Sequence, residues 1–107
     1  MKVLRLKKKK DFTRVLKTGK RVHAETLSVV YLPADETKIA VCVGKKYGKS
    51  VQRNRIKRLL REAFRTAPRL FAPCHILLIP KVAEDYSYAA FSRDICKILK
   101  REKLVET

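Results

Sequence analysis

The sequence has no tryptophan, only three glycines, and ten acidic residues against 27 basic ones, which gives a formal net charge of +17. Because nothing in the chain can neutralise this excess, we expect the protein to bind a polyanion, and nucleic acid is the obvious one. Solubility alone would not require charge of a single sign. An anionic membrane surface is a weaker alternative, since it would need a basic helix with a spare apolar face, and none is apparent.

Paired cysteines and long apolar runs are missing as well. Cys42, Cys74 and Cys96 lie far apart, are odd in number and form no Cys-x-x-Cys motif, which argues against a disulfide framework or a zinc site. We expect all three to be small buried residues in a reduced, cytoplasmic protein. No run approaches ~18 apolar residues, and no apolar segment follows the basic N-terminus, so we predict neither a membrane span nor a signal peptide.

Hydrophobic residues make up 46% of the 107 positions, enough for one compact domain over residues 1–107, which the charge marks as nucleic-acid-binding. An exposed basic arm is expected at about residues 1–10, with Val3, Leu4 and Leu6 as the apolar residues that could anchor it. The spacing of Phe12, Val15 and Leu16 predicts a helix over 11–18, with Gly19 as its C-terminal stop. Further helices are predicted at about 51–66 and 87–103.

Strands are predicted where apolar or alternating segments end in turn residues. One or two strands are expected within residues 21–33, a third at 38–44, and a last, largely buried one at 74–79 between Pro73 and Pro80. The predicted order is α-β-β-β-α-β-α. This order favours an α+β fold, a single-domain two-layer sandwich with helices packed on one four-stranded sheet.

The region from residue 45 to 65 carries nine Lys or Arg residues and a single acid, Glu62. A helical projection places an apolar face on one side, formed by Ile56, Leu59, Leu60, Ala63 and Phe64. Polar side chains fall opposite it: Asn54, Arg58, Arg61 and Arg65. The flanks carry Arg53, Arg55 and Lys57. An ordinary solvated face would alternate charges of both signs, so this arrangement indicates a surface that grips phosphate groups.

The loop that precedes this helix resembles a nucleotide-binding P-loop, because Gly44 to Ser50 follows a strand and opens a helix. The P-loop motif needs four residues between its glycines, whereas three separate Gly44 from Gly48, and no acidic Mg²⁺ motif is apparent. We therefore do not expect nucleotide hydrolysis. Free N–H groups at the start of the helix would still attract phosphate, which could belong to RNA.

The sequence predicts no catalytic residue and no metal site. The ten acids are scattered, and His23 and His75 have no partner at ligand spacing. A helix-turn-helix DNA-binding protein would need a second helix a short turn away, but a strand precedes the basic helix. Another kind of RNA-binding protein and an independent protein nuclease remain alternatives.

The segment from Lys45 to Phe64 resembles the characteristic helix of the bacterial ribonuclease P protein family, and the similarity extends to Leu6-Lys7-Lys8 and Asp11-Phe12. The resemblance implies a subunit that binds a large catalytic RNA and helps it remove the 5′ leader of precursor tRNA. It also implies that the RNA and its Mg²⁺ perform the chemistry, with no cofactor on the protein. A left-handed crossover around the basic helix is a further implication.

The resemblance assigns two binding surfaces. Residues that would contact the catalytic RNA are the loop lysines Lys45, Lys46 and Lys49 with Arg53, Asn54, Arg55, Lys57, Arg58 and Arg61, and the charged face adds Arg65. A cleft between the sheet and the first helix would hold the leader, with Phe12 as a stacking aromatic. Leu16 stands where the family often has Phe, and Val30 or Tyr31 would line the floor. The alternative for Phe12 is an ordinary core position.

Overall fold

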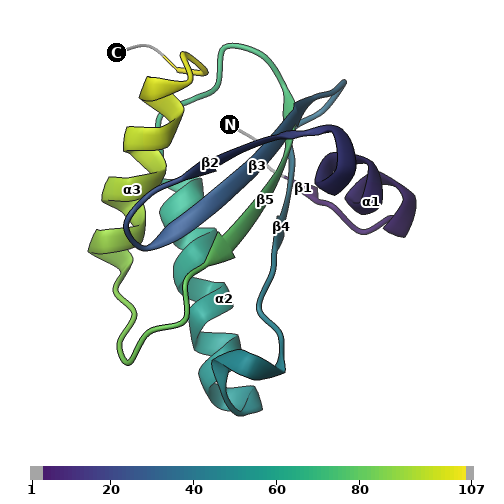
Figure 1. Ribbon diagram of the computed structural model, residues 1–107. Helices are drawn as coiled ribbons and strands as arrows, with labels where there is room; N and C mark the ends of the chain where they lie inside the picture. Colours follow the sequence, from purple (N-terminus) through teal and green to yellow (C-terminus); the bar gives the residue numbers. More distant parts are fainter. Residues whose placement is uncertain (1–3, 106–107) are drawn as a thin grey trace.

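The computed structural model describes residues 4–105, which form a five-stranded mixed sheet with helices on both faces (Figure 1). The elements are β1 (Leu4–Arg5), α1 (Lys9–Thr18), β2 (Lys20–His23), β3 (Leu27–Pro33), β4 (Lys38–Val41), a 3₁₀ turn η1 (Lys45–Tyr47), α2 (Ser50–Arg65), β5 (Cys74–Pro80) and α3 (Tyr88–Arg101). Every predicted helix and strand is present. The predicted four-stranded sheet and two layers are wrong, because the sheet has five strands and separates α1 from α2 and α3.

The additional strand is β1, at one edge of the strand order β1-β4-β5-β3-β2. It pairs in parallel with β4, and the Leu6 N–H donates to the carbonyl of Ile39 at 2.8 Å. Leu4 is half-buried and Leu6 is buried, so both anchor the arm as expected, and Arg5 between them is exposed. The strand itself was not predicted, and residues 1–3 of the arm lie outside the described part. A strand of two residues has no alternation that a sequence pattern can detect.

Side chains that alternate along the central strands build two separate cores. Val29 and Leu78 belong to the larger core beneath α2 and α3. Their chain neighbours Val30 and Leu77 point to the other face and belong to the smaller core beneath α1. Both faces of β3 and β5 are thus covered, which explains why these strands read as almost continuous apolar runs.

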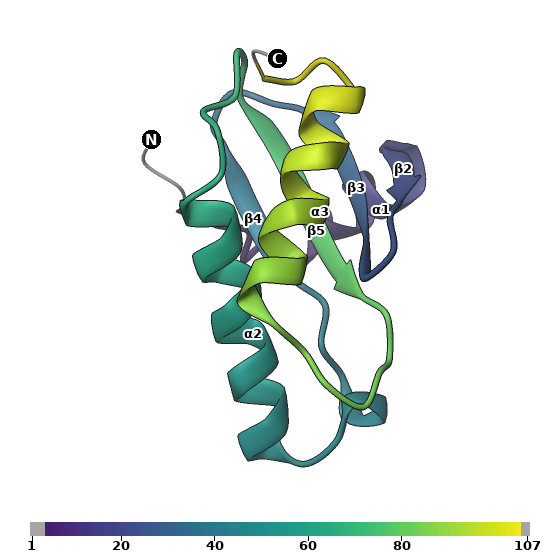
Figure 2. The same ribbon diagram turned by 90° about the vertical axis from the view of Figure 1, so that its left-hand side faces the viewer.

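The connection from β4 through α2 to β5 is a crossover between parallel neighbours. In Figure 2, α2 and α3 lie in front of the sheet, β4 and β5 both run downward, and β5 lies to the right of β4. This geometry is a left-handed crossover, whereas about 98% of such connections are right-handed. It places α2 over the β4 side of the sheet and leaves the middle of that face to α3.

Gly19 ends α1 as predicted, but not through a left-handed conformation, since its φ of −73° is available to any residue. The requirement for glycine comes from crowding. A Cβ atom at this position would lie 2.5 Å from the carbonyl oxygen of Val15 and 2.8 Å from that of Tyr31. Gly19 therefore lets the chain turn from α1 into β2 directly against β3.

The three cysteines differ in burial. Cys74 is buried, and burial raises the pKa of its thiol. Cys42 and Cys96 are only half-buried, so the prediction of full burial is wrong for these two. Cys42 lies at the edge of the core under α1, where β4 ends.

Candidate RNA interface

The basic loop before α2 is anchored by an aromatic side chain. Tyr47 is buried, its hydroxyl donates to the carbonyl of Pro80 at 2.6 Å, and its ring lies 5.4 Å from the ammonium group of Lys46. Gly48 has a φ of 119°, a conformation that favours glycine, and turns the chain into α2. The loop thus presents three exposed cations from a fixed turn: Lys45, Lys46 and Lys49.

The two sides of α2 match the predicted division only in part. The buried residues are Ile56, Leu60, Ala63 and Phe64, all from the predicted apolar face. Asn54, Arg55, Arg58 and Arg65 are exposed, whereas Arg53, Lys57 and Arg61 are half-buried. The prediction that Arg61 lies on the outer face is therefore wrong, and it lies on a flank of the helix.

The single acid of this region satisfies one arginine. Glu62 bonds Arg65, whose Nε lies 3.2 Å from Oε2, and this hydrogen bond holds the pKa of the Glu62 carboxyl below its usual range. The other eight basic side chains between residues 45 and 65 form no ion pair with any acid among residues 4–105. The loop and the first three turns of α2 therefore present uncompensated positive charge.

The predicted cleft residues on α1 occupy different environments. Phe12 is half-buried and packs against the smaller core, so part of its ring contributes to packing. Leu16 lies one turn later and is 45% exposed. Val30 is on the expected side of β3 but is 1% exposed beneath α1. The accessible apolar surface of this region therefore comes from α1.

Tyr31 does not line this cleft, which corrects the prediction that it might form the floor. Its side chain packs against the larger core on the opposite face of the sheet. Its hydroxyl donates to Oε1 of Glu102 at 2.7 Å, and Lys20 pairs with the same oxygen. Burial, together with the Glu102 carboxylate, raises the pKa of Tyr31 to about 12.

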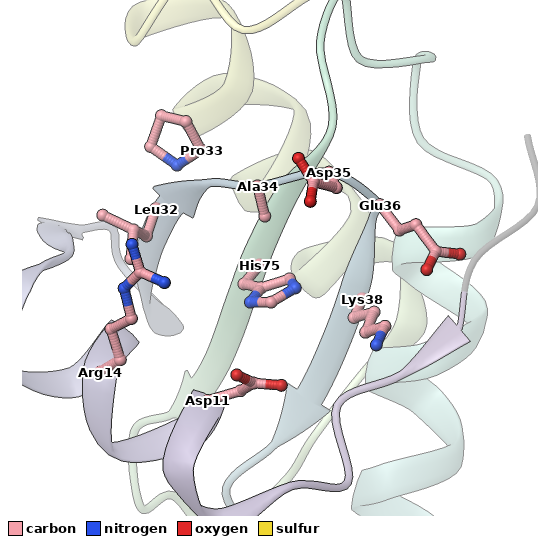
Figure 3. Close-up of a pocket in the computed structure, with 9 residues that line it drawn as sticks. All are labelled: Asp11, Arg14, Leu32, Pro33, Ala34, Asp35, Glu36, Lys38 and His75. Atoms are coloured by element: carbon pink, nitrogen blue, oxygen red, sulfur yellow. The ribbon is translucent and has the colours of Figure 1, made fainter.

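A polar pocket of about 400 Å³ opens between α1 and the sheet, beside the predicted cleft residues (Figure 3). His75 of β5 lies in the middle of its floor, Asp11 and Arg14 project from α1, and Lys38 projects from β4. The sequence prediction did not include Arg14, Lys38 or His75. Alternation along β5 could have identified His75, because it is two residues from Leu77 and so faces α1 as well.

Across residues 4–105, no three His, Cys, Asp or Glu side chains are grouped so that they could hold a metal ion. The same part of the chain contains no helix with the length and apolar character needed to cross a bilayer. Of the two histidines, His23 shares a 2.6 Å hydrogen bond with Ser28, and His75 lies in the pocket.

Comparison with known proteins gives one consistent result. The sequence matches the family described as Ribonuclease P over residues 1–103. The ribonuclease P protein component of Thermus scotoductus is 40% identical over 107 residues, which cover 98% of this chain and 64% of that relative. The corresponding protein of Coprothermobacter proteolyticus is 51% identical over 61 residues, covering 57% of this chain and 51% of the relative. The chain thus spans less than two thirds of the length of either protein.

Solved structures agree in fold over nearly the whole chain. The RNase P protein of Staphylococcus aureus superposes with a TM-score of 0.80 at 28% identity and covers 98% of this chain and 100% of its own. The RNase P protein of Thermotoga maritima superposes with a TM-score of 0.76 at 27% identity, covering 96% and 98%.

Proposed function

Because this chain belongs to the ribonuclease P protein family, we propose that it is the protein subunit of a bacterial ribonuclease P, a cytoplasmic ribonucleoprotein that matures the 5′ end of tRNA. The observation that carries the proposal is the unpaired basic surface of α2 and its loop, on the segment that resembles the family. In this proposal the partner RNA and its Mg²⁺ perform the cleavage. The protein binds RNA and needs no cofactor of its own.

The start of α2 is suited to a phosphate-rich partner. Lys49 occupies the N-cap position, and its side chain accepts no hydrogen bond from the N–H groups of the first turn. Such N–H groups and the positive end of the helix dipole attract phosphate. Exposed Arg55 and Arg58 add planar guanidinium groups that can bind two phosphate oxygens at once.

The region beside α1 is suited to a single strand of variable sequence, which we propose is the 5′ leader of precursor tRNA. Phe12 and Leu16 provide apolar surface, and the adjoining pocket holds cationic Arg14 and Lys38 and the imidazole of His75, together with three carboxylates at its lining, those of Asp11, Asp35 and Glu36. An aromatic ring stacks on any base, so contacts of this type tolerate many leaders. Basic groups nearby can pair with the backbone phosphates of the same strand.

The proposal is tested by measuring precursor-tRNA cleavage at low Mg²⁺ with the protein alone, a bacterial ribonuclease P RNA alone, and the two together. We expect cleavage only in the mixture, because the added positive charge replaces counterions that the two RNAs otherwise require. Cleavage by the protein alone would identify an independent nuclease and refute the proposal. A mixture no faster than the RNA alone would point to a different RNA partner.

The assignment of the α2 surface is tested with Arg58→Ala, and Lys97→Ala on the exposed side of α3 is a control of equal charge. Arg58→Ala should weaken binding to the ribonuclease P RNA and reduce the slope of log K against log salt concentration by about 1. Lys97→Ala should change both quantities much less. If the two substitutions weakened RNA binding equally, binding would depend on the net charge of the protein and not on the α2 surface.

A further inference from the structure

The seam between α2 and the edge strand β1 brings together basic residues that are distant in sequence. Arg5 pairs in register with Ile39, whose side chain is buried in the core beneath α2 and α3. Neighbouring side chains in register point to the same face, so Arg5 lies on the α2 side of the sheet. Leu6, the next residue, packs into the opposite core, and its backbone bond to Ile39 holds the strand in place.

The flank of α2 that is turned away from α3 carries a row of cations. Arg53, Lys57 and Arg61 follow one another at intervals of four residues, which rise by about 6 Å each, and all three are half-buried. Thr66, on the other flank, bonds the hydroxyl of Tyr88 at 2.6 Å and so marks the side that faces α3. The row of cations therefore faces the β4 and β1 edge.

Arg5 on β1 and Arg61 on α2 therefore face the same seam, Arg5 as an exposed side chain and Arg61 as a half-buried one. Burial lowers the pKa of the Arg61 guanidinium, and the positive charge of Arg5 lowers it further. Neither arginine forms an ion pair with a carboxylate among the residues that the structure describes. Further along the same flank, the Nε atom of Arg53 is buried and has no hydrogen-bond partner there. A half-buried Arg61 beside a second positive charge, and a buried donor without a partner on Arg53, are unfavourable unless an anion binds there.

We propose that Arg5 and Arg61 together bind one backbone phosphate of the partner RNA, so that its binding surface extends from α2 across the seam onto β1. This inference rests on the proposed function and adds Arg5 to the interface. Two guanidinium groups from separate elements can bind the oxygens of one phosphate from two sides. Because the seam lies on the face opposite α1, we assign this phosphate to the catalytic RNA and not to the leader.

The test is direct binding of the ribonuclease P RNA, without tRNA, to Arg5→Ala, Arg61→Ala and the double variant over a series of salt concentrations. Each single substitution should weaken binding about tenfold and lower the salt slope by about 1. Because both arginines contact the same phosphate, the double variant should lose much less than the product of the two single losses. Thermal unfolding of Arg5→Ala should occur at an unchanged or higher temperature, since the backbone holds β1 and a like-charge repulsion is removed.

Two matched variants keep this inference separate from the proposed function. The inference would be overturned if Arg5→Ala bound the RNA as tightly as the Lys97→Ala control while Arg58→Ala still bound weakly. The proposed function would then still stand. If the fold-losses in RNA affinity of the two single variants multiplied in the double variant, the arginines would bind two separate phosphates, and the inference would also be overturned. A loss of affinity seen only for precursor tRNA would overturn it as well. If Arg5, Arg58 and Arg61 could all be replaced without effect, the proposed function itself would fail.

Discussion

Replacing Phe12 with alanine should separate a leader-binding role of this side chain from a packing role. The ring lies on α1, half-buried against the core that contains Val15 and Leu77. Removing a fully buried Phe costs about 3–5 kcal/mol, so a half-buried one should lower the free energy of unfolding by about 2 kcal/mol. In a domain of this size that lowers the unfolding temperature by roughly 10 °C, which leaves a folded protein to assay at 25 °C.

The functional loss should be confined to the substrate that carries a leader. Stacking of a base on an aromatic ring is worth ~1–3 kcal/mol, or roughly 5- to 150-fold in affinity. Because part of the Phe12 ring is covered by the protein, we expect the lower part of this range, about tenfold. The assay is equilibrium binding of precursor and mature tRNA to the reconstituted ribonucleoprotein. Affinity for precursor tRNA should fall, and affinity for mature tRNA should stay the same.

Val15→Ala is the matched control, since Val15 is fully buried in the same core and cannot touch a ligand. It should destabilise the fold by about 2 kcal/mol, as Phe12→Ala does, without changing the ratio of precursor to mature affinity. Equal losses for the two tRNAs with Phe12→Ala, or the same change of ratio with Val15→Ala, would refute a leader contact and make Phe12 a core residue only.

Three further substitutions test the packing that supports these surfaces. Asp94 is 2% exposed and accepts hydrogen bonds from the backbone and hydroxyl of Thr26 at 2.8 and 2.6 Å; burial opposes its charge, but hydrogen bonds from Arg93 and Thr26 outweigh that effect and lower its pKa. The ionised Asp94 carboxylate should stabilise the fold fully above its unfolded pKa of ~3.9, and this stabilisation should disappear as the pH falls through the lower folded pKa. Asp94→Asn should therefore lower the free energy of unfolding by about 1–2 kcal/mol at pH 7 and by less in acid, measured by urea unfolding against pH. A stability difference between the two proteins that does not change with pH would contradict this. Gly19→Ala should cost about 1–3 kcal/mol, because the new Cβ meets two carbonyl oxygens, and unchanged thermal unfolding would disprove the crowding. Tyr31→Phe should cost about 1 kcal/mol through the lost bond to Glu102 and leave precursor-tRNA affinity unchanged; a selective loss for the precursor would return Tyr31 to the cleft.

Local pattern was sufficient for the elements that carry the proposed function. The apolar spacing of Ile56, Leu60, Ala63 and Phe64 predicted α2 and its buried face, because a helix repeats every ~3.6 residues whatever it packs against. Two prolines bounded β5, since proline limits regular structure on either side. The excess of basic residues is a property of composition, so the expectation of a polyanionic partner needed no structure.

Tertiary structure decided what depends on neighbours distant in the chain. Alternation places Val30 and Tyr31 on opposite faces but cannot say which face α1 covers, and only the packed sheet answers this. Arg61 is on a flank because of where α2 lies over the sheet, and β1 exists only through its bonds to β4. Sequence periodicity describes one element at a time. The placement of Arg5 and Arg61 on one seam, and the pocket around His75, each join separate elements and appear only when these pack together.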